Sequence, residues 1–160
     1  MSGDAATGNS EFTAKDSTIT TNKGDTFYVT NTSSTITLEN NTIINNDTSG
    51  NFLRIQSDSW GNSNSNGGDV ILNATNQEIK GNIVVDKIST LNISLKNNST
   101  FEGIINGSNT AKSLELTLDK TSKIKLLGDT YLTSFNNEDS SNSNIDFNGY
   151  KIYVNGKTIN

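Results

Sequence analysis

The residues best suited to chemistry gather in one short polar segment, "SDSWGNSNSNGGD" at positions 57–69. It holds the only tryptophan, Trp60, among Ser, Asn and Gly. An aromatic ring packs against the apolar side of a sugar, while amides and carboxylates bind the sugar hydroxyls. The alternative is a solvated excursion in which Trp60 folds back over the scaffold. The predicted carbohydrate contacts in this segment are Trp60, Asp58, Asn62, Asn64 and Asp69.

A partial calcium-loop pattern occurs in the same segment. "NSNSNG" at 62–67 places oxygen-bearing side chains at alternate positions and then a glycine, as calcium loops do. All three side chains are Asn, and Asn73 stands where a bidentate Glu should close the site. Calcium needs carboxylates, so the predicted ligands are Asp58 and Asp69, with calcium an optional cofactor. A second acidic group consists of Glu138, Asp139 and Asp146.

The final strand-like run, "YKIYV" at 150–154, adds one further candidate. Tyr150 and Tyr153 differ in parity along this run, so one of the two faces outward on a strand. An outward tyrosine either binds sugar or covers the end of the core. We include Tyr150 among the predicted sugar contacts.

The composition argues against catalysis. The 160 residues contain no Cys and no His, which removes thiol nucleophiles, zinc thiolate sites and histidine-based triads. Arg54, the only arginine, suits a salt-bridge partner better than a lyase base, and the acids fall at predicted turns or inserts. We predict that the protein is not an enzyme, with pectin degradation as the lesser alternative.

The charge balance excludes two classes of partner. The net charge is -5 and the isoelectric point is about 4.6, which is a poor match for nucleic acid. No apolar run approaches the roughly 20 residues that span a bilayer, so membrane insertion is not expected.

The secondary structure of the scaffold is indicated by short runs of alternating apolar residues, such as "LNISL" at 91–95 and "LELTL" at 114–118. Period-two alternation predicts strands with one buried face. The runs recur at nearly constant distance: Val70, Ile93 and Leu116 are 23 apart, as are Leu72, Leu95 and Leu118, and Ile79, Phe101 and Ile124 follow at 22 and 23.

Repeats of this length predict a solenoid. We expect a right-handed parallel β-helix with about 22–23 residues per coil and with Asn ladders at its turns. The alternative is a β-sandwich, which also has many short strands. Residues 1–11 are expected to be a flexible lead-in and residues 12–160 one domain, with polar insertions at 57–69 and 136–144.

Several phrases resemble a known family. "NFLRIQ" (51–56), "NGGDVILNATNQEIKGNIVVDKISTLNISLKNNSTFEGIING" (66–107), "SKIKLLGDTYLTSF" (122–135) and "SNIDFNGYKIYVNG" (143–156) are similar to secreted carbohydrate-binding-domain proteins of clostridia and related anaerobes. The resemblance spans most of residues 27–156. It implies a right-handed parallel β-helix, secretion, and binding of acidic plant polysaccharide and calcium. The acidic calcium turns of those proteins have no residue-by-residue match here.

The functional expectation is a non-catalytic carbohydrate-binding or adhesion module. Its partner would be a polysaccharide or a cell-surface glycan, acidic in the family that it resembles, and its location extracellular or on the cell surface. The alternative is a structural solenoid whose coil ends stack into fibres or that serves as a surface stalk, because a β-helix exposes strand edges at both ends.

Overall fold

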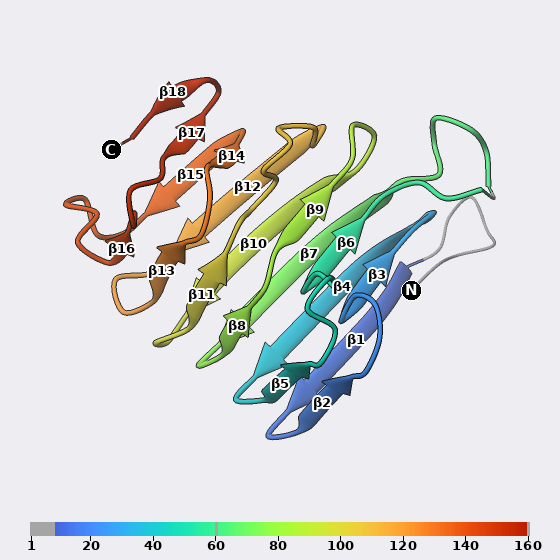
Figure 1. The fold of residues 1–160 in the computed structure, drawn as a ribbon, viewed down its shortest axis with the longest axis horizontal. Helices are drawn as coiled ribbons and strands as arrows, with labels where there is room; N and C mark the ends of the chain where they lie inside the picture. The colour runs from blue at the N-terminus through green and yellow to red at the C-terminus, as the bar shows by residue number, and fades with distance from the viewer. Residues whose placement is uncertain (1–8, 60, 160) are drawn as a thin grey trace.

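The computed structural model describes residues 9–59 and 61–159, and every regular element in it is a β-strand. The strands form a parallel β-solenoid of about six turns, stacked along one axis (Figure 1). The predicted parallel β-helix is confirmed, and the dominance of parallel pairing excludes the β-sandwich. Among the described residues there is no helix that is long and apolar enough to cross a membrane.

The widest side of the solenoid is one continuous sheet with a strand from each turn. Its strands are, in order, β1 (Asn9–Lys15), β4 (Thr32–Glu39), β7 (Gly68–Thr75), β10 (Thr90–Lys96), β12 (Ser113–Leu118) and β15 (Ser134–Asn137). We call its solvent side the first face.

The second side is made of shorter strands in two groups. One group pairs β2 (Thr18–Thr21) with β5 (Thr42–Asn45). The other contains β8 (Glu78–Lys80), β11 (Thr100–Gly103), β13 (Lys123–Leu126) and β16 (Ile145–Asp146). The solvent side of these strands is the second face.

Three-residue strands dominate the third side, whose solvent side is the third face. The first group contains β3 (Phe27–Val29), β6 (Leu53–Ile55) and β9 (Ile83–Val85), and the second contains β14 (Thr130–Leu132) and β17 (Ile152–Val154). A parallel bridge between Ile83 and Ile105 carries the stacking across the fourth turn. The last strand, β18 (Lys157–Thr158), pairs antiparallel with β17.

The observed register corrects part of the predicted repeat. Leu72 pairs with Ile93 and Ile93 with Leu116, so the third and fourth turns are offset by 21 residues rather than 23. The prediction had aligned Leu72 with Leu95, which instead faces Ala74 and Leu118. A slip of two residues leaves the same side chains facing inward, so alternation alone could not detect it. The column Ile79, Phe101, Ile124 is confirmed.

The predicted boundaries also shift. Strand β1 begins at Asn9, so residues 9–11 belong to the first sheet and not to a lead-in. The first insertion is shorter than expected, because β7 already includes Gly68 and Asp69. The second begins later than expected, since residues 136 and 137 lie in β15 opposite Thr117 and Leu118. In the last turn, Asn137 lies opposite Leu118 and Ile145 lies opposite Ile124.

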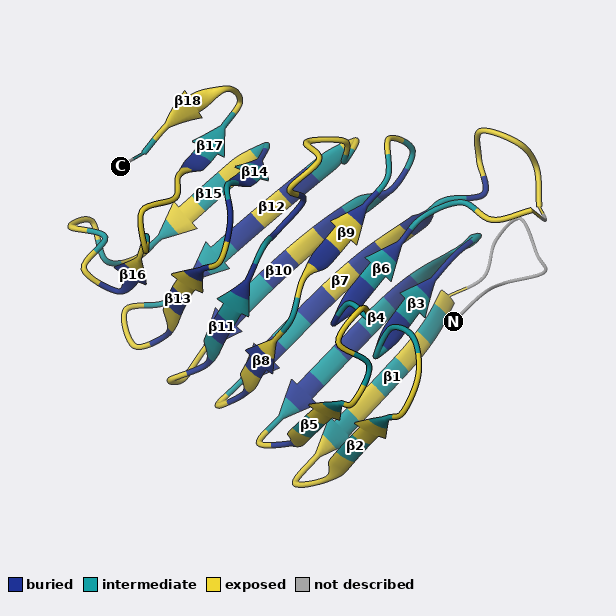
Figure 2. Ribbon diagram, in the orientation of Figure 1, coloured by how far each residue is buried: buried dark blue, intermediate teal, exposed yellow. Residues whose placement is uncertain are grey.

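Buried positions alternate with more exposed ones along the strands, and the buried positions of successive strands lie next to one another along the axis (Figure 2). Most of the buried side chains are aliphatic. Ile36 and Leu72 have no exposed surface, and Ile93 and Leu116 are almost fully covered. Each such side chain contributes about 1.5–3 kcal/mol by leaving water. Buried and exposed side chains alternate along each strand, so about half of them remain at the surface. This explains how a chain with so few apolar residues folds.

Buried amides and hydroxyls lock the corner between the first and second sides. The Gln77 carboxamide accepts from the backbone N–H of Asn41 at 2.9 Å and donates to the Asn41 carbonyl at 2.9 Å. The Ser99 hydroxyl, one turn further, accepts from the Gln77 N–H at 3.1 Å. Buried polar groups cost free energy unless they are paired, so these bonds enforce one stacking register.

The predicted Asn ladder is confirmed at the solvent side of this corner. Asp16, Asn40 and Asn76 all have positive φ, between 47° and 51°, in consecutive turns. The Asn40 amide donates to the Asp16 carboxylate at 2.7 Å, and the Asn76 amide donates to the Asn40 oxygen at 3.3 Å. Asn and Asp tolerate this left-handed backbone better than other non-glycine residues, which explains the abundance of Asn.

Several other turns are held by an ionised Asp. The carboxylate of Asp47 accepts from the Ser49 hydroxyl at 2.6 Å and from the Gly24 N–H at 2.7 Å. These bonds lower the pKa of Asp47 to about 2. At Asp119 burial alone would raise the pKa, but the N–H of Asn97 and the Ser122 groups outweigh it and bring the pKa to about 2.

We expect acid to destabilise the solenoid over a defined range. A carboxyl whose pKa is lower in the folded state contributes stability above its unfolded value of 3.8 and loses it as the pH falls through the folded value. The thermal unfolding midpoint should therefore drop between about pH 4 and about pH 2. In Asp47→Asn the drop should be shallower, and a wild-type midpoint that stays flat across this range would contradict the assignment.

Candidate binding face

Large polar-aromatic side chains concentrate on the third face. The three-residue strands there bury their first and last residues, so the central side chain points to solvent. Pairing sets Tyr28, Arg54 and Val84 in one outward row, and Tyr131 and Tyr153 in a corresponding row near the other end. Because buried and exposed residues alternate along each strand and the strands pair in register, the aromatic rings lie together on one side of the solenoid.

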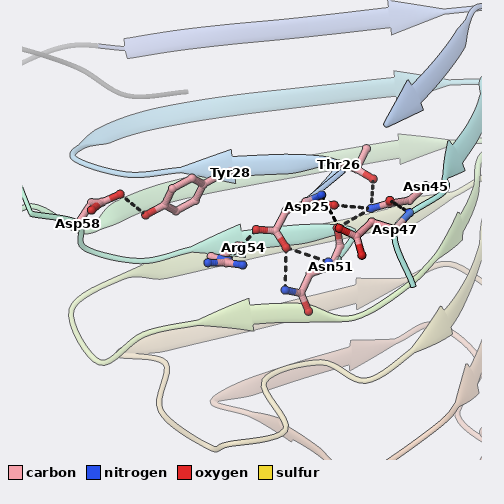
Figure 3. Close-up of polar contacts among 9 residues, drawn as sticks. Asp25, Thr26, Tyr28, Asn45, Asp47, Asn51, Arg54 and Asp58 are labelled. Atoms are coloured by element: carbon pink, nitrogen blue, oxygen red, sulfur yellow. Dashed lines mark hydrogen bonds and ion pairs between the residues drawn. The ribbon is translucent and has the colours of Figure 1, made fainter. Parts of the chain in front are cut away.

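Tyr28 and Arg54 form the N-terminal part of this face (Figure 3). The Arg54 guanidinium lies 5.5 Å from the centre of the Tyr28 ring, within cation–π range. The Tyr28 hydroxyl donates to the Asp58 carboxylate at 2.9 Å, which joins β3 to the loop after β6. The ring is consequently held in one orientation with part of its surface in solvent.

Arg54 forms an ion pair with a buried carboxylate. Its Nε lies 2.7 Å from Oδ2 of Asp25, whose side chain is only 6% exposed. Oδ1 of Asp25 accepts from the backbone N–H and from the side-chain amide of Asn51, both at 2.8 Å (Figure 3). The predicted role of Arg54 as a salt-bridge partner is confirmed, and the carboxylate with which it pairs is buried.

The hydrogen bond between Tyr28 and Asp58 contributes to opposite shifts in the pKa values of these two groups. Burial, with the hydrogen bond to Asp58, raises the pKa of Tyr28. The Ser59 N–H and the Tyr28 hydroxyl lower the pKa of Asp58. Tyr28 is therefore a neutral donor and Asp58 an ionised acceptor at neutral pH.

Beside Asp58 the loop surrounds a polar hollow of about 260 Å³. Asn66 is buried there and its amide donates to the Asp58 carbonyl at 2.7 Å, which closes the loop on itself. Asp86 forms another wall. Burial would raise its pKa, yet hydrogen bonds from the Ser89 hydroxyl and from Ser57 lower it. The remaining lining includes Ser63, Asn64 and Lys87.

Two tyrosines stack at the C-terminal part of the third face. The rings of Tyr131 and Tyr153 have centroids 4.8 Å apart and are inclined by 7°. Tyr150 lies just before β17 and is 40% exposed. Stacking restrains both rings, so a ligand that packs on them need not order them first.

The structure places the predicted site residues in different parts of the molecule. Asp58 and Asn64 share the loop hollow, Tyr150 lies at the other end of the chain, and Trp60 lies outside the described residues. The carbonyl of Asn62 accepts from the Ser65 N–H at 3.0 Å and so supports the loop backbone.

The structure does not bring Asp69 into that hollow. Asp69 faces outward on β7, accepts from the Thr90 hydroxyl at 2.8 Å, and lines a separate depression on the first face. Within residues 9–59 and 61–159, no group of three or more acidic side chains could hold a metal ion. Calcium binding by Asp58 and Asp69 stays a prediction.

Sequence reasoning missed most of the third face. Tyr28 and Tyr131 stand 103 residues apart, in strands too short to give a clear periodic signal. The one available signal was the common pattern of an aromatic or Arg between two apolar residues, as in "FYV" and "LRI".

The fold defines the chain as a parallel β-solenoid protein. Protein-family models, curated proteins and solved structures were each compared with the chain, and none of them matches it.

Removal of Arg54 should destabilise the fold more than removal of an exposed lysine. In Arg54→Ala the buried Asp25 carboxylate loses its cation, and we expect a loss of about 2 kcal/mol in the free energy of unfolding. Lys125→Ala should cost much less, because solvent screens the exposed ion pair of Lys125 with Glu102. Urea unfolding of both variants measures the difference, and equal losses would contradict the structural role of the Asp25–Arg54 pair.

Proposed function

We propose that the protein is a non-catalytic module that binds carbohydrate along its third face. The observation that carries the proposal is the distribution of its aromatic side chains: Tyr28, Tyr131, Tyr150 and Tyr153, which are all four tyrosines, belong to the strands of this side or to the segment just before β17. Sugar-binding surfaces use such rings as platforms, with amides and carboxylates beside them for the hydroxyls.

The spacing of the tyrosines along the third face suits an extended polysaccharide. Tyr28 lies in the first turn and Tyr131 in the fifth, and strands of successive turns lie about 4.8 Å apart, which separates the two rings by about 19 Å along the axis. A linear polysaccharide laid parallel to the axis would meet both aromatic groups and the loop hollow. A small sugar would meet only one of them.

The charges favour a neutral glycan. Asp58 and Asp86 are ionised beside the loop hollow, and Lys87 is the one cation among the described residues that line it. The Arg54 guanidinium is already paired with Asp25. An acidic polysaccharide, which the family resemblance implies, would need calcium as a bridge to these carboxylates.

The same carboxylates support a binding role over a catalytic one. Hydrolysis of a glycoside needs one carboxyl with a raised pKa as the acid and a second as base or nucleophile. Asp58 and Asp86 both have lowered pKa values, so neither suits the acid. In keeping with the expected role in adhesion, we propose that the module acts outside the cell or on its surface.

A glycan array tests the proposal, followed by titration calorimetry on each ligand that binds. We expect a neutral polysaccharide to bind without calcium, and Tyr131→Ala and Tyr28→Ala each to weaken it about tenfold through loss of ring contacts. Trp60→Ala tests the loop in the same way. Ile71→Ala is the matched control, because Ile71 is a large exposed side chain on the first face.

Three results would overturn the proposal or its details. Absence of binding with calcium and with chelator would refute the carbohydrate module. Equal loss in Ile71→Ala would refute the third face as the site. Binding of acidic glycans that chelator abolishes would replace the neutral ligand with a calcium-bridged one.

A further inference from the structure

Among the described residues, the first turn of the solenoid has a less buried core layer than the second turn. Phe12 and Ala14 of β1 are only partly buried, whereas the residues that pair with them in the next turn, Ile36 and Leu38, have no exposed surface. The Phe12 ring packs edge-on against Phe27, with centroids 5.3 Å apart. In the part of the chain that the structure describes, β1 is the first strand of its sheet and pairs on one side only (Figure 1).

The C-terminal end is closed on its third side. Strand β18 turns back through Asn155 and Gly156, both with positive φ, and pairs antiparallel with β17. It occupies the edge of β17 on which a following coil would pair. Head-to-tail stacking of copies would require β3 of the next copy at that same edge, so β18 blocks it.

Backbone direction leaves β1 ready for an antiparallel partner. The N–H of Asp16 donates to the Glu39 carbonyl at 3.0 Å, so even-numbered residues of this segment point their backbone groups at β4. The backbone groups of residues 9, 11, 13 and 15 therefore point to the open edge, since alternate residues bond on opposite sides.

We propose that two copies of the chain pair through β1, antiparallel, about a two-fold axis at Thr13. This register sets Thr13 opposite Thr13 of the second copy and Glu11 opposite Lys15 of the second copy. All of these odd-numbered residues direct their backbone groups at the partner, as a hydrogen-bonded antiparallel pair requires.

The side chains are complementary in this register. Glu11 and Lys15 bear opposite charges, and the two-fold axis repeats their contact on both sides of Thr13. On the inner side, Phe12 meets Ala14 of the second copy, a large side chain against a small one. Both would gain the burial that their counterparts in the second turn already have.

Pairing through β1 would place two third faces in one particle. Two binding faces on one particle raise avidity for a repetitive ligand without any new contact to it. The pairing itself rests only on β1 and is independent of whether the third face binds a glycan.

Single-cysteine cross-linking tests this register, because the chain has no cysteine of its own. In Thr13→Cys the two Cα atoms would lie about 5.5 Å apart across the axis, which a disulfide can bridge. Thr37→Cys is the matched control, at the equivalent outward position of β4 in the second turn. We expect oxidation to give a covalent dimer in Thr13→Cys and monomer in Thr37→Cys.

Sedimentation equilibrium of the wild type and charge variants provides an independent measurement. Wild type should reach twice the chain mass of 17.2 kDa. Glu11→Lys, which sets lysine against Lys15, should weaken the dimer about tenfold. A triple variant combines Glu11→Lys with Lys15→Glu and Glu39→Lys. It restores opposite charges between the copies and keeps an ion pair between residues 15 and 39 within each copy, so it should recover the dimer.

The contrary results are equally specific. A wild type that stays monomeric at every concentration would overturn the proposal. Equal cross-linking of Thr13→Cys and Thr37→Cys would show random collision, and open-ended rods would show head-to-tail stacking instead.

Discussion

Parallel pairing of each turn on the one before it is the constraint on which the rest of this molecule depends. Since equivalent strands lie one above another, inward side chains become columns and outward side chains become rows. The apolar columns supply most of the stability, but they tolerate a slip of two residues. The buried bonds among Asn41, Gln77 and Ser99 do not, because a slip would leave their polar groups unpaired inside the corner.

The rows that result differ from face to face, and this difference gives the surface its chemistry. The second face carries exposed lysines and glutamates in pairs such as Lys125 with Glu102. The third face instead carries tyrosines and the paired Arg54, held in place by Asp58 and Asp25. A surface with ordered aromatic rings and ionised acceptors is suited to a hydroxyl-rich ligand, which is the basis of the proposed carbohydrate binding.

Much of this fold could be predicted from the chain alone, and the reasons for the failures are physical. Alternating apolar residues predicted the strands, and their recurrence predicted the solenoid. The offset between Leu72 and Ile93 escaped prediction because a two-residue shift conserves the buried face. Asp58 and Asn64 share a hollow as their proximity in sequence suggested, but the meeting of Tyr28 with Arg54 depends on stacking of successive turns, which local patterns do not encode.

Backbone contacts between turns, measured by nuclear Overhauser spectroscopy on isotope-labelled protein, test this account most directly. The stacked turns predict cross-strand contacts of Leu72 with Ile93, and of Tyr28 with Arg54, as neighbouring pairs in parallel sheets. Contacts of Leu72 with Leu95 instead would mean a constant offset of 23 residues. Antiparallel contacts throughout would contradict the solenoid and, with it, the gathering of tyrosines on the third face.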